Sequence, residues 1–443
     1  MESLNNKSTP NTLRGLFKSW QKLSLLLLVF AIISVIWASV QLVQFASHGK
    51  SDISVMLRTA ALLKKGAGGE IYAENDERTN WPRCIPPAGM VFFQPLTLVS
   101  PTVAGIIWAL INLGLLAGSV FALFQIFKNL DHKKSVYLNI FPWALAILLY
   151  LSIGSLQVGQ FSVLFIACWI FYLYAASKKN FFWEGISLSI PSSIKLYPLL
   201  MLASPLFSRK SRIIKFICFF LFGIFITSFL IPVFFYRART LDLSKSFFTH
   251  TILSSEGRVA RYQDLKYSSF SDQGLDVVLL RYLSYVPEFH SHFPRLPHLF
   301  LERQIVLILA NIIRVVVLFI STFVAFHWVR HVKNIPFYST MMMAALWSST
   351  LYLILPGVKA RYAVYTFIGF LPLLEAAELA RINFNWKKFT AFCSLIVFCF
   401  LLILQAMPDL LRVLGIGLVG AFALWTANVF LLIRYKLTNQ KSM

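Results

Sequence analysis

Long apolar stretches separated by short basic segments run through this chain of 443 residues. A helix needs roughly 20 apolar residues to cross the hydrocarbon core of a bilayer, and its backbone must satisfy its own hydrogen bonds there. The sequence therefore predicts an all-α, polytopic integral membrane protein. We expect about ten full spans, at residues 23–46, 102–127, 136–153, 161–177, 213–234, 303–329, 337–356, 361–380, 389–406 and 409–433.

The chain has few charged residues, and most of them are basic. Only 13% of the residues are charged, about half the share of a soluble protein, which excludes an ordinary soluble enzyme and a disordered chain. The net charge is +23. In a membrane protein, Lys and Arg gather in the cytoplasmic loops, so the excess sets orientation and attracts anionic lipid rather than nucleic acid.

Basic clusters fall on alternate loops, which predicts cytoplasmic termini. We expect a cytoplasmic tail over 1–22, a transmembrane module over 23–380, and C-terminal helices with a short cytoplasmic tail over 381–443. The module then has two long outer loops, 47–101 and 235–302. Most acidic residues lie in these loops, so we expect the chemistry on the outer face. The outer loops lack a glycosylation sequon, which favours a bacterial inner membrane.

Residues 181–208 are apolar, yet basic residues flank them on both sides, so a single span would place one flank outside. Pro191 and Pro198 interrupt this segment. We expect two short helices that form a re-entrant hairpin, with Ser192, Ser193 and Lys195 at its tip. Non-helical backbone at that depth must be buried in protein or line a wet cavity, so Lys195 should face a cavity. The alternative is a plain span with unusual flanking charges.

The first outer loop offers a carboxylate just beyond the first span. Asp52 precedes an amphipathic stretch over 53–63. It is either the N-cap of an interfacial helix or a general base at the membrane boundary, and the two roles are compatible. Arg58, one to two turns later, could bind phosphate or anchor the helix at lipid head groups. Glu74 and Asp76 alternate as divalent-cation ligands would, but a polar loop tip has the same composition.

Other polar residues lie at the outer ends of expected helices. Gln160 could face a sugar or pair two helices. Lys359 and Arg361 follow a Pro-Gly turn, and two cations at the boundary must pair or meet a phosphate. The second outer loop mixes cations with aromatic residues, which suits either a sugar phosphate or a lipid surface. Its cations are Arg258, Arg261, Lys266 and Arg281.

Motifs for nucleotide binding, zinc hydrolysis and serine hydrolysis are missing from the sequence. We therefore assign no cofactor and no metal site, and leave a divalent cation open. A lipid-linked sugar flippase and a structural membrane subunit remain alternatives to an enzyme. A transporter would need polar residues deep in several helices and symmetry between its halves. Here the polar residues cluster at the outer ends instead.

Four short motifs occur in one order along the chain. They are Asp52 with Arg58-Thr59-Ala60-Ala61, Gly66 and Tyr72; Pro86-Pro87 with Pro95-Leu96; Gly159-Gln160 with Gly185 and Lys195-Leu196-Tyr197-Pro198; and Ser271-Asp272-Gln273-Gly274-Leu275 with Arg281. With this set the chain resembles glycosyltransferase family 87, the polyprenol-phosphate-mannose-dependent α-mannosyltransferases and their relatives in the GT-C superfamily.

The resemblance implies a GT-C-type helical bundle with its active site on the outer face. It implies transfer of a sugar from a polyprenyl-phosphate donor to a glycan or glycolipid hydroxyl, with inversion at the anomeric carbon. Asp52 would be the general base. The donor phosphate or substrate would be bound by residues among Arg58, Gln160, Lys195, Arg281, Lys359 and Arg361.

The chain departs from the family between residues 356 and 362. Relatives often carry Trp and His there, and this chain has Lys359 and Arg361. The transferred sugar, mannose or another hexose or pentose, and the acceptor therefore stay open.

Overall fold

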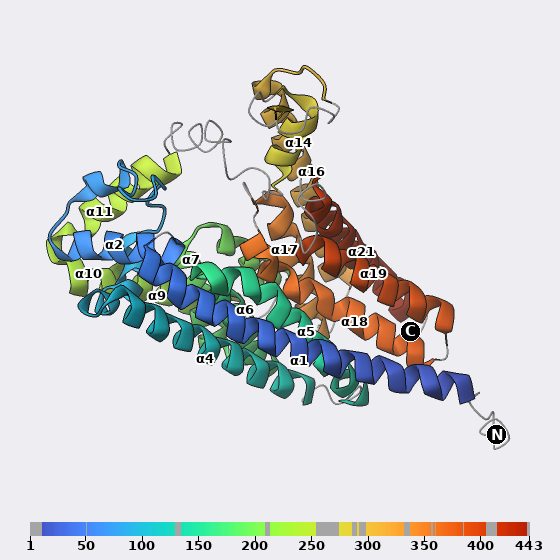
Figure 1. Cartoon of the computed structure of the whole chain (residues 1–443). Helices are drawn as coiled ribbons and strands as arrows, with labels where there is room; N and C mark the ends of the chain where they lie inside the picture. Colours follow the sequence, from blue (N-terminus) through green and yellow to red (C-terminus); the bar gives the residue numbers. More distant parts are fainter. Residues whose placement is uncertain are drawn as a thin grey trace.

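The helical fold is confirmed. The computed structural model describes residues 11–49, 51–128, 134–208, 213–253, 274–285, 290–291, 298–331, 337–355, 358, 360–383, 385–404 and 414–440. Within these ranges the chain forms helices joined by loops, and β pairing is limited to one isolated bridge between Asn75 and Pro82 (Figure 1).

The α-helices range from single turns to long spans. They are α1 (Asn11–His48), α2 (Asp52–Lys64), α3 (Pro87–Met90), α4 (Pro101–Lys128), α5 (Lys134–Val158), α6 (Ser162–Ser177), α7 (Phe181–Ile194), α8 (Ala203–Ser208), α9 (Ile213–Phe225), α10 (Ile231–Tyr236), α11 (Thr240–Phe247), α14 (Leu275–Leu283), α16 (Arg303–His331), α17 (Phe337–Ile354), α18 (Phe367–Ile382), α19 (Trp386–Leu404) and α21 (Ile416–Gln440).

Short helical turns of other geometry extend or connect these helices. The 3₁₀ turns are η1 (Gly69–Tyr72), η2 (Val91–Phe93), η3 (Pro95–Leu98), η5 (Tyr197–Leu202), η7 (Arg237–Arg239) and η9 (Ala360–Thr366), and the π turns are η6 (Ile226–Leu230) and η8 (Phe248–Leu253).

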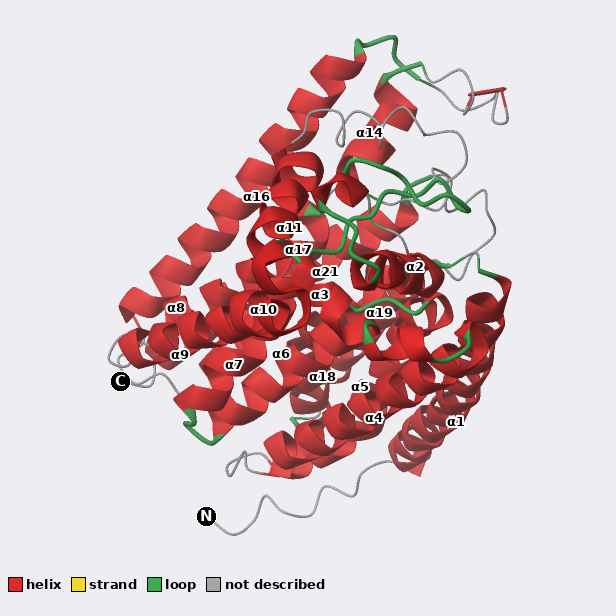
Figure 2. Cartoon of the chain, turned by 90° about the vertical axis from the view of Figure 1, so that its left-hand side faces the viewer, coloured by secondary structure: helices red, strands yellow, loops and turns green. Residues whose placement is uncertain are grey.

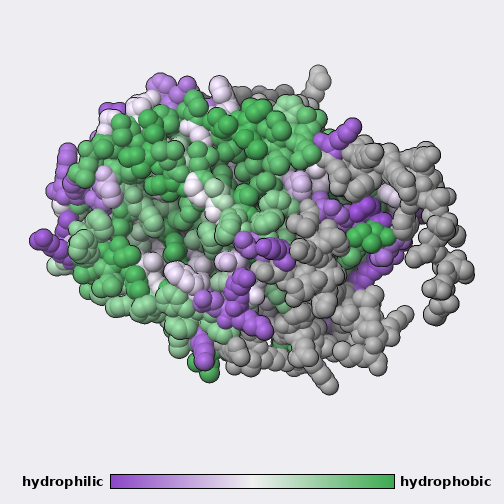
Figure 3. All heavy atoms as spheres, turned by 90° about the horizontal axis from the view of Figure 1, so that it is seen from below, coloured by the Kyte–Doolittle hydropathy of each residue, from purple (hydrophilic) through white to green (hydrophobic). Residues whose placement is uncertain are grey.

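Eight helical segments of the described chain are long and apolar enough to cross a membrane. The other two expected spans correspond to the shorter apolar helices α6 and α17. Most of the α6 side chains are buried, because α4, α5, α7, α17 and η9 all pack against that helix. Figure 3 shows a wide hydrophobic surface on one face of the bundle, with hydrophilic residues at its edges. The chain is thus a polytopic membrane protein.

The expected break in the segment 181–208 lies at Lys195. The backbone of Lys195 is extended between α7 and η5, and Pro198 begins the second helical part together with Tyr197. The expectation that Ser192 and Ser193 form the tip is wrong. Both remain in the last turn of α7, where their hydroxyls donate to the carbonyls of Leu188 and Ser189.

The physical reason for that difference is the position of Pro191. It lies in the last turn of α7, where its missing N–H costs a single hydrogen bond and does not end the helix at once. Two short helical parts are present as expected, and their re-entrant path through a membrane stays a prediction.

Parts of the two expected outer loops pack together over one end of the bundle. The helices α2, α10 and α11 gather there (Figure 1), and α3 packs against all three (Figure 2). Arg239 donates to the carbonyls of Leu63 (3.3 Å) and Ala67 (3.0 Å), and Ser246 donates to the carbonyl of Gly69 (2.5 Å). These bonds fasten the α10–α11 segment to the end of α2, so the site residues on α2 belong to a built structure.

Candidate active site

Asp52 is the first residue of α2 rather than its cap. Ser51 holds the extended cap position, and its hydroxyl lies 2.9 Å from that of Ser54. The interpretation of Asp52 as the N-cap is therefore wrong by one residue, which is a usual error for helix ends. The consequence is chemical, because the Asp52 carboxylate is not used on its own helix and is 15% exposed.

Gln160 holds one oxygen of that carboxylate. Its Nε2 donates to Asp52 Oδ2 at 3.0 Å. Gln160 follows Gly159, whose φ of +74° is unfavourable for a residue with a Cβ. A Cβ on Gly159 would also lie 2.7 Å from atoms of Ile53 and Leu42. Glycine thus lets the turn between α5 and α6 approach α2 closely enough for Gln160 to reach Asp52.

The same oxygen of Asp52 meets a cation from the far end of the sequence. Arg361, at the start of η9, forms an ion pair with Asp52 Oδ2 through its Nη1. The Nε of that guanidinium is buried and has no hydrogen-bond partner among the described residues. A buried donor without a partner is costly, and a ligand oxygen would satisfy it.

Lys195 joins this cluster through an aromatic ring. Its Nζ lies 5.5 Å from the ring centre of Tyr362 and 5.5 Å from that of Tyr197. The guanidinium carbon of Arg361 lies 5.7 Å from the same Tyr362 ring. Two cations therefore flank one tyrosine, beside the carboxylate of Asp52. The extended backbone at Lys195 directs its side chain here, away from the α7 helix.

A chain of hydroxyl groups fixes the tyrosines from behind. The hydroxyl of Tyr365 lies 2.6 Å from that of Tyr197 and 2.8 Å from that of Ser162. Tyr365 is fully buried, and its ring packs against Trp169 at 5.4 Å between ring centres. Helix α6 thereby supports Tyr197, and Tyr197 in turn supports the Lys195 ammonium.

Arg58 lies on α2 but is engaged elsewhere. Its Nε and Nη2 donate to the two oxygens of Asp76 at 2.7 and 2.6 Å, and its Nη1 donates to the Gly49 carbonyl at 2.9 Å. Asp76 also accepts from the Thr79 hydroxyl at 2.7 Å. This bidentate pair closes the loop that follows α2 and contains η1. Asp76, which the sequence suggested as a cation ligand, and Arg58, which it suggested for phosphate, therefore bind each other.

One predicted site residue, Arg281, lies away from this cluster. Arg281 is buried on α14, which packs on α16 and stands well apart from α2 (Figure 1). Lys359 lies outside the described residues, as do Arg258, Arg261 and Lys266. Among the described residues, the structure holds no cluster of metal-ligating side chains.

The tyrosines of the site were not among the site residues predicted from the sequence. Tyr197 and Tyr362 each stand within two residues of a predicted cation, so the segments Lys195–Pro198 and Arg361-Tyr362 carried a signal.

Comparison with known proteins adds one finding. A family model for glycosyltransferase family 87 matches residues 85–347, which is more than half of the chain. Gln160 and Lys195 lie inside the matched range, whereas Asp52 and Arg361 lie outside it. Curated proteins and solved structures give no match.

Proposed function

The chain belongs to glycosyltransferase family 87, and we propose that it moves a sugar from a polyprenyl-phosphate donor to a hydroxyl of a glycan or glycolipid, with inversion. The observation that carries this proposal is the cluster of one carboxylate and two cations. Asp52, Arg361 and Lys195 come from three distant parts of the chain. Inverting transfer from a phosphate leaving group needs a base and a cationic site for the leaving anion.

Asp52 acts as the base in this mechanism. The acceptor oxygen attacks the anomeric carbon of the sugar while its proton passes to a carboxylate oxygen of Asp52. The bond between the anomeric carbon and the phosphate oxygen breaks at the same time, and the electron pair leaves with the polyprenyl phosphate. Attack from the side opposite the leaving group inverts the anomeric carbon.

Arg361 and Lys195 stabilise the phosphate that leaves. Cations fixed at the place where negative charge develops lower the barrier without reorganisation. Arg361 retains a buried Nε without a partner in the described chain, which supports a phosphate ligand there. A phosphate bound to Arg361 also competes with Asp52 for the guanidinium. Donor binding would thereby loosen the ion pair and leave the Asp52 carboxylate for the acceptor hydroxyl.

Gln160 has a positioning role in the proposal. Its amide holds Asp52 Oδ2 at 3.0 Å and orients the second oxygen of the carboxylate. Arg58 is assigned to the loop structure rather than to phosphate, because Asp76 and the Gly49 carbonyl occupy all three of its nitrogens.

The proposed location is a bacterial inner membrane with both termini in the cytoplasm. Asp52 follows the first span, and the outer face is where the charge pattern of the loops puts it. The membrane also delivers the polyprenyl donor directly to the boundary at which Asp52 lies.

A transfer assay tests the proposal. The purified protein in lipid vesicles is supplied with a radiolabelled polyprenyl-phosphate sugar and a short glycan acceptor, and in a parallel reaction with the nucleotide sugar. We expect labelled glycan from the lipid donor alone. Movement of the labelled lipid between leaflets without any transfer would contradict the proposal and favour a flippase.

A further inference from the structure

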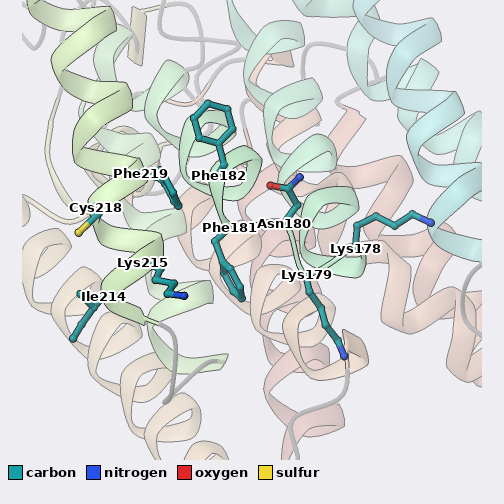
Figure 4. A pocket seen from close by; sticks show the side chains of 9 residues that line it. All are labelled: Lys178, Lys179, Asn180, Phe181, Phe182, Ile214, Lys215, Cys218 and Phe219. Carbon is teal, nitrogen blue, oxygen red and sulfur yellow. The ribbon is translucent and has the colours of Figure 1, made fainter.

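A hollow in the surface of the molecule lies at the opposite end of α6 from Gln160. Its volume is about 680 Å³. With a rise of 1.5 Å per residue, the 16 residues of α6 separate it from the Asp52 cluster by about 24 Å. It opens between the start of α7 and the start of α9 (Figure 4), and it is lined by Lys178, Lys179, Asn180, Phe181, Phe182, Ile214, Lys215, Cys218 and Phe219.

The lining of this hollow is basic, and its charge is unbalanced. Among the described residues that line it, three are lysines and none is acidic. Within the described part of the chain, Lys178, Lys179 and Lys215 make no ion pair. Lys178 extends away from the hollow in Figure 4, and its Nζ lies 6.0 Å from the ring centre of Tyr174. Lys179 and Lys215 stand on either side of the Phe181 ring in Figure 4, and their long side chains are the two cations at the rim of the hollow.

Lys179 also has an unusual backbone for a lysine. Its φ is +56°, in the left-handed region that favours glycine or asparagine at the end of a helix. The chain thus keeps a long cation where conformation alone favours a small residue, and such strain is more often tolerated at a functional position than elsewhere.

The other side of the hollow is apolar and continues along α9. Phe181, Phe182 and Phe219 form its wall. On α9, Ile214 at the hollow is 74% exposed, and further along the helix Leu221 and Phe225 are 58% and 53% exposed. This helix belongs to a segment long and apolar enough to span the membrane, so its exposed face meets lipid tails. The basic hollow is therefore continuous with an apolar surface along α9.

We propose that this hollow binds an anionic glycerophospholipid, with its phosphate at Lys179 and Lys215 and its acyl chains along α9. An amphiphile matches both surfaces, because a soluble anion would leave the apolar wall wet. A zwitterionic lipid brings its own cation, which the lysines would repel. The site does not depend on the sugar chemistry at Asp52.

Native mass spectrometry of the full-length protein in detergent tests the proposal. Phosphatidylglycerol and phosphatidylcholine with identical acyl chains are titrated against the wild type and against a variant carrying Lys179→Asn and Lys215→Gln. We expect the wild type to prefer phosphatidylglycerol. The preference should fall about five-fold for each lysine removed.

The matched control carries Lys387→Gln and Lys388→Gln, two exposed lysines of α19 that do not line the hollow. The control should keep the wild-type preference. Equal preference in the pocket variant and the control would overturn the proposal. Displacement of phosphatidylglycerol by equimolar inorganic phosphate would also overturn it, in favour of a soluble anion.

A second measurement needs no substitution at the lysines. Cys218 is exposed and lines the hollow. Its alkylation by N-ethylmaleimide, followed by peptide mapping in the wild type, should slow several-fold with phosphatidylglycerol and stay unchanged with phosphatidylcholine. Equal rates of Cys218 alkylation in the two lipids would contradict the binding of phosphatidylglycerol in the hollow. This measurement does not depend on the folding of the double variant.

Discussion

Two aspartates between α1 and α3 have opposite environments, although both follow α1 within thirty residues. The carboxylate of Asp76 is 1% exposed and is bound by Arg58 and Thr79. That of Asp52 is 15% exposed and is held at one oxygen by Gln160 and Arg361. A base must reach its substrate, so Asp52 suits chemistry and Asp76 suits structure.

The pKa of Asp76 gives the first prediction. Burial alone would raise this pKa, but hydrogen bonds from Arg58 and Thr79 and the Arg58 charge lower it to about 2 from an ordinary 3.8. A depressed pKa stabilises the fold above the unfolded-state pKa, and this contribution is lost as the pH falls towards 2. It amounts to about 2 kcal/mol at neutral pH.

Thermal unfolding followed by tryptophan fluorescence checks this prediction. We expect the unfolding temperature of Asp76→Asn to be lower than that of the wild type at pH 7. This difference in unfolding temperature should shrink as the pH falls from 4 to 2.5. A difference that stays constant over that range would show that the Asp76 charge does not stabilise the loop.

Lys195 gives a prediction about the donor. We expect Lys195→Gln to lower kcat/KM for the lipid donor by about 10²-fold, because one preorganised group facing the leaving phosphate is lost. Lys195→Arg should recover part of the rate, and Lys387→Gln on α19 should leave it unchanged. A wild-type kcat/KM in Lys195→Gln would contradict the assignment of Lys195 to the phosphate site.

Site residues could be predicted from the sequence where they lie in a local motif, whereas contacts between residues far apart in the sequence could not. Asp52 and Lys195 stand in motifs with a local signal. The pairing of Asp52 with Arg361 joins residues 309 positions apart, and local periodicity says nothing about such a contact. The engagement of Arg58 was hidden for a related reason, because its partner Asp76 faces it only once the loop has closed.

At the scale of the elements, the turn between α5 and α6 decides whether the site forms. Gly159 has a φ of +74° and closely approaches α2, and its carbonyl accepts from Trp108 Nε1 at 3.0 Å. We expect Gly159→Ala to cost about 2 kcal/mol of stability through backbone strain and crowding. It should also lower transfer activity, because Gln160 then moves from Asp52.

Gly114→Ala is the matched control, since that position lies in the middle of α4 and a Cβ added there would meet no atom of the described residues within 4 Å. We expect it to be neutral or slightly stabilising, as alanine is the better helix former. Equal behaviour of the two variants in thermal unfolding and transfer would mean that Gly159 has no special role.

Helix positions were predictable because hydrophobicity records them directly. Each of the ten apolar stretches contains a helix in the structure, while some helix ends differ from the expected ones by seven residues, as in α21, or by twelve, as at the start of α1. The ends at Asp52 and Ile194 depend on tertiary contacts and on where a proline falls within a turn. These two ends are also the ones that build the site, so the least predictable boundaries matter most for function.

At the scale of the whole molecule, the proposed function requires two distinct faces. The loop that carries Glu77 lies beside the α2 end of the bundle, and Lys178 and Lys215 lie beyond the opposite end of α6. In a cysteine-free background, we expect Glu77→Cys to react with an impermeant maleimide added to intact spheroplasts. Lys178→Cys and Lys215→Cys should react only after permeabilisation.

The two lysine positions also test the re-entrant hairpin, because one precedes and the other follows the segment 181–208. If either position reacts from outside while the other does not, the segment crosses the membrane once. The orientation stays a prediction from the loop charges, and the packing of the α10–α11 segment on the end of α2 could not be predicted from the sequence. That packing depends on side-chain bonds such as Arg239 to the end of α2.

The most direct test of the central claim is the transfer rate of Asp52→Asn with a radiolabelled polyprenyl-phosphate sugar and saturating acceptor. Asparagine keeps the shape and the Gln160 contact site but cannot take the proton. We expect a fall in kcat of about 10²- to 10⁴-fold, with binding of the donor retained and with partial activity in Asp52→Glu. Transfer by Asp52→Asn at the wild-type rate would contradict the assignment of Asp52 as the base.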